Sequence, residues 1–168
     1  MSLAKFAVMF FLISLLVPKQ VFANTFQAEV LEVLNTYSLK IDTEEGEKVV
    51  RIAEIITPKA IFGTFPCEKE AIAYLREMTY GKTMTFIYWA TDAAGRSVCE
   101  VLLPDGSSVG TLMVASGYAL QDLYYSSSAD LKFLQVSARK NSLGLWRQVD
   151  QDIEVNELFA IASTRLDY

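Results

Sequence analysis

Arginine is among the residue types of this sequence suited to binding an anion, and two arginines, Arg51 and Arg96, lie in segments with the composition of strands. The planar guanidinium group donates paired hydrogen bonds to phosphate and carboxylate groups. Together with Lys59, the two arginines would form an anion-binding pocket if no acidic side chain offset their charge. The alternative is that Arg51 and Arg96 pair with carboxylates on the strands, such as Glu54 or Glu100.

The composition excludes several kinds of catalytic site. The sequence contains no histidine, which removes Ser-His-Asp and Cys-His nucleophilic sites and the usual histidine-containing zinc sites. Segment 105–110 holds two glycines but lacks the lysine of a phosphate-binding loop. Any catalysis would therefore depend on carboxylates, arginines, lysines or tyrosines.

The first 23 residues have the features of a signal peptide. Lys5 precedes an apolar run of 13 residues, 6–18, and Val21-Phe22-Ala23 offers the small-residue pattern for cleavage before Asn24. A helix of that length spans about 20 Å, short of the roughly 30 Å hydrocarbon core of a bilayer. We expect an exported protein, periplasmic or secreted, with no transmembrane segment in the mature chain. An uncleaved N-terminal anchor is the alternative.

The chain that remains after cleavage is acidic. Removing residues 1–23 takes away two lysines and no acidic residue, which changes the net charge from −5 to −7. Proteins that bind nucleic acid along its phosphates usually carry a basic surplus. The charge therefore lowers the expectation of nucleic-acid binding, although a local basic patch would still permit it.

The two cysteines, Cys67 and Cys99, have two interpretations. In an oxidising compartment an even pair of cysteines is a candidate disulfide. Alternatively, both are small buried hydrophobic residues, because free cysteine packs well inside protein cores. The sequence alone does not distinguish these two states.

Residues 24–147 have the length and pattern of one α+β domain that is mainly β. Runs rich in Val, Ile and aromatic residues predict five short strands, and helical spacing of apolar residues predicts about three helices. The strands are predicted at 26–33, 38–41, 48–55, 84–89 and 96–103, and the helices at about 67–81, 109–116 and 128–141. This order is that of a five-stranded OB-fold barrel with helical additions. The C-terminal tail, 148–168, has the spacing of an amphipathic helix.

Three ordered segments resemble the staphylococcal nuclease (thermonuclease) domain. The first joins Val50-Arg51-Ile52 to residues 55–59, which are similar to the family's V-R-L and D-[AT]-P-E blocks. The second, 92–98, is similar to its D-x-x-G-R-x-[LV] turn. The third comprises residues 103–106, 112–114, 117–119, 138–139 and 144–146. The resemblance covers about residues 26–147 and implies the barrel fold of that family.

The resemblance also implies which residues of an active site are retained. Arg51 and Arg96 match the two arginines that hold the phosphate in the members that cleave nucleic acid. Thr57 matches the residue whose carbonyl helps to hold calcium. Of the tyrosine pair that flanks the nucleotide, Tyr125 matches and Leu123 does not.

The acidic residues of that active site are replaced. Tyr37 and Ile56 stand where the family has its two calcium-binding aspartates, and Lys59 stands in place of the catalytic glutamate. Ala94 replaces a tyrosine that packs near the substrate phosphate. Calcium requires six to eight oxygen ligands and takes most of its affinity from carboxylates, and a charged lysine cannot accept a proton from water.

We therefore expect a protein that keeps the fold of this family but has lost efficient hydrolysis and needs no cofactor. Its expected role is to bind an anion, a nucleic acid or a protein partner. The alternative is a calcium-dependent nuclease whose acidic residues have moved, for which Asp42, Glu54 and Glu68 are candidates. The sequence does not identify the ligand or the partner.

Overall fold

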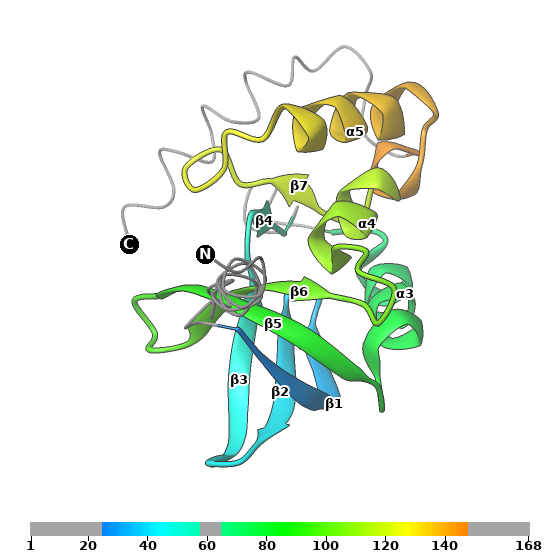
Figure 1. Ribbon diagram of the computed structural model, residues 1–168. Helices are drawn as coiled ribbons and strands as arrows, with labels where there is room; N and C mark the ends of the chain where they lie inside the picture. The colour runs from blue at the N-terminus through cyan, green and yellow to red at the C-terminus, as the bar shows by residue number, and fades with distance from the viewer. Residues whose placement is uncertain (1–24, 58–64, 148–168) are drawn as a thin grey trace, which may run out of the picture.

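The computed structural model describes residues 25–57 and 65–147, and five of its strands form a closed barrel (Figure 1). The strands follow one another around the barrel in the order β1-β2-β3-β6-β5. They are β1 (Thr25–Asn35), β2 (Ser38–Thr43), β3 (Gly46–Ile52), β5 (Thr83–Thr91) and β6 (Ser97–Leu102). A separate two-stranded sheet joins β4 (Ile55–Ile56) to β7 (Leu120–Gln121).

All neighbouring barrel strands are antiparallel except β3 and β6, which run parallel. The barrel closes where β1 meets β5, and there the rings of Phe26 and Phe86 are stacked with centroids 5.3 Å apart. Register shifts between Val30 and Glu32 on β1, and between Tyr88 and Ala90 on β5, are the irregularities that let strands curve around a small barrel.

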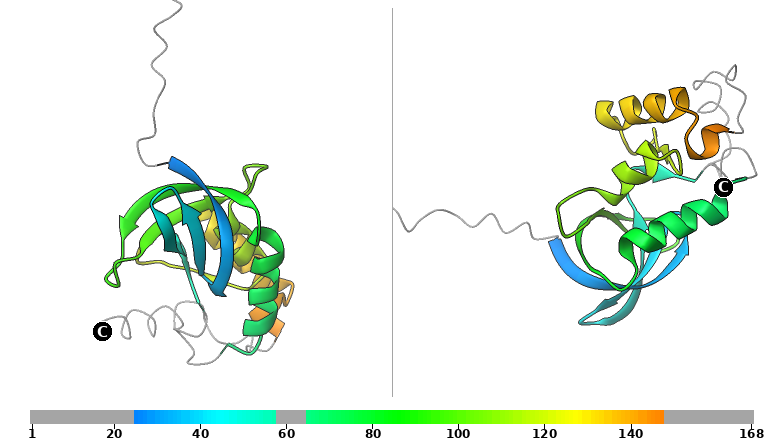
Figure 2. Two further views of the ribbon diagram at one scale, coloured as in Figure 1. Left: turned by 90° about the horizontal axis from the view of Figure 1, so that it is seen from below. Right: turned by 90° about the vertical axis from the view of Figure 1, so that its right-hand side faces the viewer.

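The three helices lie on one side of the barrel, with α5 farthest from it (Figure 2). They are α3 (Glu68–Thr79), α4 (Val109–Ala115) and α5 (Ala129–Lys140), followed by a 3₁₀ turn, η1 (Gly144–Arg147). Helices α4 and α5 begin at serine caps, because the hydroxyls of Ser108 and Ser128 accept hydrogen bonds from backbone N–H groups of the first turn. Within the described residues, no helix is long and apolar enough to span a membrane.

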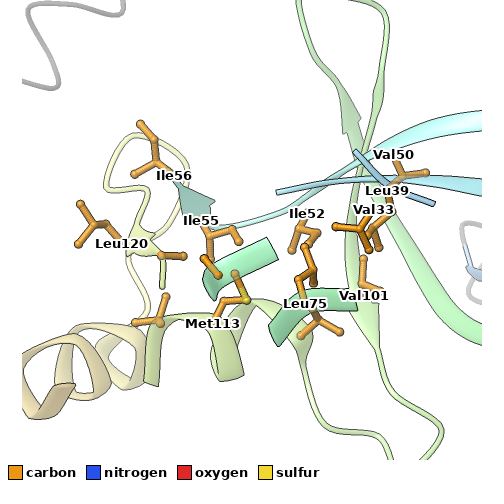
Figure 3. Packing of buried hydrophobic residues seen from close by; sticks show 14 of the residues in the cluster. Val33, Leu39, Val50, Ile52, Ile55, Ile56, Leu75, Val101, Met113 and Leu120 are labelled. Atoms are coloured by element: carbon orange, nitrogen blue, oxygen red, sulfur yellow. The ribbon is translucent and has the colours of Figure 1, made fainter. Parts of the chain in front are cut away.

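The hydrophobic core fills the barrel and continues between β4, β7 and the helices (Figure 3). Inside the barrel, Leu39 and Val101 pack with Ile52 near Leu75 of α3. Beyond the barrel, side chains of β4 and β7 continue the same cluster toward α4. The labelled members of this second part are Ile55, Ile56, Met113 and Leu120. Because the cluster is continuous, the barrel and the helical layer form one core.

Two glycines allow the end of α4 to approach η1 closely. Gly117 and Gly144 both have positive φ, +72° and +50°. A Cβ atom on Gly117 would lie 2.3 Å from the carbonyl oxygen of Leu143, and one on Gly144 would lie 2.5 Å from the carbonyl oxygen of Gly117. The amide of Leu145 donates to that same Gly117 carbonyl at 3.0 Å. Only glycine permits this contact without a shift of the backbone.

The predicted fold class, a mainly β, α+β barrel with about three helices, is confirmed, with two differences of detail. The predicted strand at 48–55 is wrong at its end, because β3 stops at Ile52. Glu54 then adopts φ of +62°, which turns the chain into β4. The two-residue strand β7 was not predicted. The predicted signal peptide (1–23) and the predicted C-terminal helix (148–168) lie outside the described residues.

Candidate functional site

Arg51 and Arg96 lie on two neighbouring parallel strands, near the end of β3 and just before the start of β6. Arg51 is opposite Val98 in the register of these strands, and Arg96 is the residue just before β6. The neighbours of Arg51 on β3, Val50 and Ile52, are buried in the core. Since side chains alternate along a strand, Arg51 points away from the barrel interior. The topology thus places both guanidinium groups on the outer face of the barrel.

Arg96 is held by the turn that precedes it. One carboxylate oxygen of Asp92 accepts hydrogen bonds from the backbone amides of Ala94 (3.0 Å) and Arg96 (2.9 Å). The other accepts from Arg96 Nε at 2.8 Å and lies 2.7 Å from Arg96 Nη2. Burial works to raise the pKa of Asp92, but these bonds from Arg96 outweigh it and leave the pKa below its ordinary value.

Tyr37 lies beside Arg96 at the start of β2. The Arg96 guanidinium carbon is 5.8 Å from the centre of the Tyr37 ring. Partial burial acts to lower the pKa of Arg96, but interactions with Asp92 and Tyr37 raise it above the ordinary value. The backbone of Tyr37 is fixed as well, since its N–H donates to the Asn35 side chain at 3.0 Å and its carbonyl accepts from the Ile52 amide at 2.8 Å.

Arg51 forms an ion pair with Asp122, 71 residues later in the chain. Arg51 Nη2 lies 3.0 Å from Asp122 Oδ2, and Asp122 is only 3% exposed. The Arg51 guanidinium also lies 5.8 Å from the centre of the Tyr125 ring. A single N–H of Arg51 makes this bond, whereas a guanidinium has five donors. An arginine in this position can therefore hold the carboxylate and a ligand oxygen together.

The loop after β7 that carries Asp122 is braced by buried polar groups. The Asp122 amide donates to the Glu54 carbonyl at 2.8 Å, and Asp122 Oδ1 accepts from the Tyr124 amide at 3.1 Å. Ser126 Oγ donates to the Glu54 carboxylate at 2.7 Å. The Gln121 side chain donates to the Ser128 carbonyl at 2.9 Å. These bonds fix the loop between the β3–β4 turn and α5.

The braced loop presents aromatic side chains to solvent. Tyr124 is 79% exposed and Tyr125 is 65% exposed, and their rings meet edge to face with centroids 4.6 Å apart. Leu123 beside them is also exposed. Large apolar side chains on a rigid loop are typical of binding surfaces, because little side-chain freedom is lost when a ligand covers them.

Two further polar features lie on the same face. The hydroxyl of Ser38 is buried and has no hydrogen-bond partner among the described residues, and Ser38 is the direct cross-strand neighbour of Arg51. A buried polar group without a partner is uncommon and is a feature of functional sites. Glu100 is partly buried, and desolvation, followed by the nearby charge of Glu54, raises its pKa.

Of the two interpretations of the arginines, the pocket without any acidic side chain is not what the structure shows. Both guanidinium groups are paired, and the partners are Asp122 and Asp92 rather than Glu54 or Glu100. Lys59, the third expected cation, lies outside the described residues. Asp122 was missed because its partner lies far away in the sequence, and no local pattern marks it. Asp92 is the aspartate of the D-x-x-G-R-x-[LV] turn at residues 92–98, and Arg96 is the arginine of the same turn. The turn pattern therefore already contains both members of this ion pair.

The positions where the resemblance implies calcium ligands do not fit that ion. Ile56 is buried in the apolar core and pairs with Leu120 across the β4–β7 sheet. Tyr37 lies against Arg96, so it places a ring beside a cation where calcium would need a carboxylate. Thr57 directly follows Ile56 at the edge of the described segment. In residues 25–57 and 65–147, no three acidic, cysteine or histidine side chains are grouped to hold a metal ion.

The alternative acidic residues differ in position. Glu54 belongs to the network around Arg51 through Ser126 and the Asp122 amide. Asp42 is exposed on β2, four residues beyond Ser38, the partner of Arg51. Glu68 is the first residue of α3. Of the three, only Glu54 is linked by these contacts to the arginines.

The cysteines are buried, free thiols. The disulfide expected as one alternative for Cys67 and Cys99 is not formed, and both side chains belong to the hydrophobic core. Burial raises the pKa of Cys99 to about 11. Burial, followed by the charge of Glu70, also raises the pKa of Cys67. The thiols are therefore structural groups.

The closed five-stranded barrel with flanking helices places the protein in the class of OB-fold barrels. A family model described as staphylococcal nuclease homologue matches residues 39–148, and the chain belongs to that family. Two similar proteins, one from Escherichia coli O157:H7 and one from Escherichia coli, are each named "Uncharacterized endonuclease". Each is 28% identical over 123 residues, which are 72% of this chain and 77% of the relative.

Proposed function

We propose that this protein is an exported binding module that holds a phosphate-bearing compound at Arg51 and Arg96 and does not hydrolyse it by the calcium-dependent route. The observation that carries the proposal is the occupation of the two expected ligand positions by Tyr37 and Ile56. One side chain packs on Arg96 and the other is part of the apolar core. Neither position can supply a carboxylate, so the metal-dependent part of the chemistry is absent while the cationic part is retained.

Three features of the outer face support phosphate binding. Arg51, near the C-terminal end of β3, and Arg96, just before the N-terminal end of β6, lie where these parallel strands pair, and each guanidinium is fixed by one carboxylate. The buried Ser38 hydroxyl is beside Arg51. The exposed ring of Tyr125 is beside Arg51 and would stack on a base or another flat group. Lys59, outside the described residues, would add a third cation.

A small phosphate compound suits this site better than a long nucleic acid. The chain has a net charge of −5 and an isoelectric point near 4.8. A polymer that extends beyond the site would meet the negative charge of the rest of the surface as well, whereas a small ligand meets only the charged groups around Arg51 and Arg96. We therefore propose a nucleotide-sized ligand for this site and expect a long nucleic acid to bind less tightly.

A calorimetric titration tests this function. Nucleoside 3′,5′-bisphosphate is titrated into the purified protein with calcium and with a chelator. We expect binding that does not depend on calcium and that falls at least about tenfold in Arg51→Ala or Arg96→Ala, since each removes charge-assisted hydrogen bonds. Binding that requires calcium would contradict the proposal, and so would equal binding by the wild type and both variants.

A second function, a working endonuclease with moved acidic residues, has two observations in its favour. The two Escherichia coli relatives are named "Uncharacterized endonuclease". Asp122 is a carboxylate bonded to Arg51, and the Glu54 carboxylate accepts from Ser126 of the same loop. Incubation of linear and supercoiled DNA with the protein, with and without calcium, separates the two functions. Cleavage that is lost in Arg96→Ala but retained in the matched surface variant Lys48→Ala would establish the nuclease.

Export is part of the proposal and rests on residues 1–23. To test export, the full chain is expressed in a bacterium and the cells are separated into extracellular, periplasmic and membrane fractions. The mass of the protein in each fraction is then measured. We expect a mature chain that begins at Asn24. A full-length chain that stays with the membrane would indicate the uncleaved anchor instead.

A further inference from the structure

We propose that Asp122 determines the charge of the phosphate group that this site accepts: it makes the site favour singly charged phosphates over doubly charged ones. The inference rests on the proposed binding function and adds to it a residue outside the sequence patterns of the family. Among the described residues, Asp122 is the one carboxylate that is bonded to Arg51, and it is nearly completely buried.

The first step concerns the position of the charge. Asp122 Oδ2 lies 3.0 Å from Arg51 Nη2, so its charge is as close to the guanidinium as that of a bound phosphate oxygen would be. A ligand oxygen on another N–H of Arg51 would lie within a few ångströms of this carboxylate. At such a distance, in a partly buried site, repulsion between like charges is substantial.

The second step is that Asp122 cannot easily move away. Its Oδ1 accepts from the Tyr124 amide at 3.1 Å. Its backbone amide donates to the Glu54 carbonyl, and its carbonyl accepts from the amides of Tyr125 and Ser126. Glu54 is held in turn by the Ser126 hydroxyl at 2.7 Å. The backbone bonds fix the position from which the side chain starts, and rotating the carboxylate away would break its bonds to the Tyr124 amide and to Arg51. A ligand must therefore accommodate the carboxylate.

The third step is that other negative charges reinforce the preference. Asp92 neutralises Arg96 in the same way, and Glu54 and Glu100 lie close enough to each other for the charge of Glu54 to raise the pKa of Glu100. Four carboxylates thus accompany two guanidinium groups among the described residues. A phosphate monoester carries nearly two charges above pH 7 and a diester carries one, so repulsion costs the monoester about twice as much free energy.

The experiment compares two ligands that differ in this charge. A nucleoside 5′-monophosphate and its 5′-methyl phosphodiester are titrated at pH 8 and constant ionic strength. The wild-type protein is expected to bind the diester at least as tightly as the monoester. Two arginines without such a carboxylate would bind the dianion more tightly. A wild type that prefers the monoester by tenfold or more would overturn the inference without any variant.

The key variant is Asp122→Asn, which removes the charge and keeps an acceptor oxygen for the Tyr124 amide. We expect the diester to bind about threefold more tightly and the monoester about tenfold more tightly, because the gain in free energy scales with ligand charge. The control variant Asp42→Asn removes one exposed carboxylate at the far end of β2 and should change both affinities by less than about twofold.

The outcomes separate this inference from the proposed function. If neither ligand binds, or if Arg51→Ala binds both as the wild type does, the proposed function fails. If Arg51→Ala loses binding but Asp122→Asn weakens both ligands to the same extent, Asp122 only supports Arg51 and the inference alone fails. Circular dichroism of Asp122→Asn establishes that it is folded. An unfolded variant leaves the wild-type comparison of the two ligands as the deciding result.

Discussion

The carboxylate of Asp122 and the guanidinium of Arg51 meet at 3.0 Å, although 71 residues separate them in the sequence. The contact joins the barrel strand β3 to the loop that follows β7. It therefore ties the expected binding residue to the loop that presents Tyr124 and Tyr125. The proposed ligand preference depends on this contact, and so does the predicted effect of Asp122 on stability, which makes the ion pair a natural target for mutation.

Asp122→Ala should destabilise the protein by about 2–3 kcal/mol. The change leaves a half-buried guanidinium without its partner and the Tyr124 amide without its acceptor, and truncation of one partner in a buried pair is costly. Urea denaturation followed by circular dichroism measures the effect. Asp42→Ala, at an exposed position on β2, should change the free energy of unfolding by less than about 0.5 kcal/mol. Equal effects of the two changes would contradict the role of the ion pair.

Gly117→Ala should destabilise the protein by more than about 2 kcal/mol. Its new Cβ would lie 2.3 Å from the Leu143 carbonyl oxygen, and φ at this position is +72°. The matched control is Gly106→Ala, where φ is +87° but no atom lies within 4 Å of the new Cβ. This control should cost only about 1 kcal/mol from the backbone conformation. The difference between the two variants in thermal denaturation isolates the steric contact.

Glu100→Gln should stabilise the protein at pH 7.5 and have little effect at pH 4. Burial and the charge of Glu54 raise the pKa of Glu100 in the folded state above its value in the unfolded chain. The unfolded chain therefore releases this proton first, and the stability contributed by the group falls as the pH rises from the unfolded pKa, about 4.3, through the folded pKa. Melting temperatures of the two proteins from pH 4 to 8 measure the effect. A difference that does not change with pH would contradict it.

Thiol titration distinguishes the two states proposed for Cys67 and Cys99. Both thiols are free and buried, and the pKa of Cys99 is raised to about 11. Since the thiolate is the reactive form, neither cysteine should react rapidly with an aromatic disulfide reagent in the folded protein at pH 8. Both should react after denaturation without a reductant. The absence of reactive thiols in the denatured protein would show that the cysteines form a disulfide.

Local sequence patterns predicted the helices and strands well where their conformation depends mainly on residues within the same segment. The helical spacing of apolar residues located α4 and α5, and the structure adds the serine caps, Ser108 and Ser128, that begin them. The end of β3 was wrong for a related reason. Segment 48–55 has a continuous strand-like composition, but Glu54 adopts φ of +62° where its backbone meets the Asp122 loop. The chain therefore leaves the strand where it contacts a loop that is distant in the sequence.

The sequence alone determined the residue types that are available: two arginines in recognisable patterns, no histidine, and apolar or aromatic residues at the positions of the expected acids. These follow from composition and spacing, so they need no knowledge of the fold. Only the tertiary structure decided that Asp122 pairs with Arg51 and that Ile56 belongs to the core. Such contacts join segments that are distant in sequence. The barrel and its loops bring them together by packing as a whole, and no local pattern records that packing.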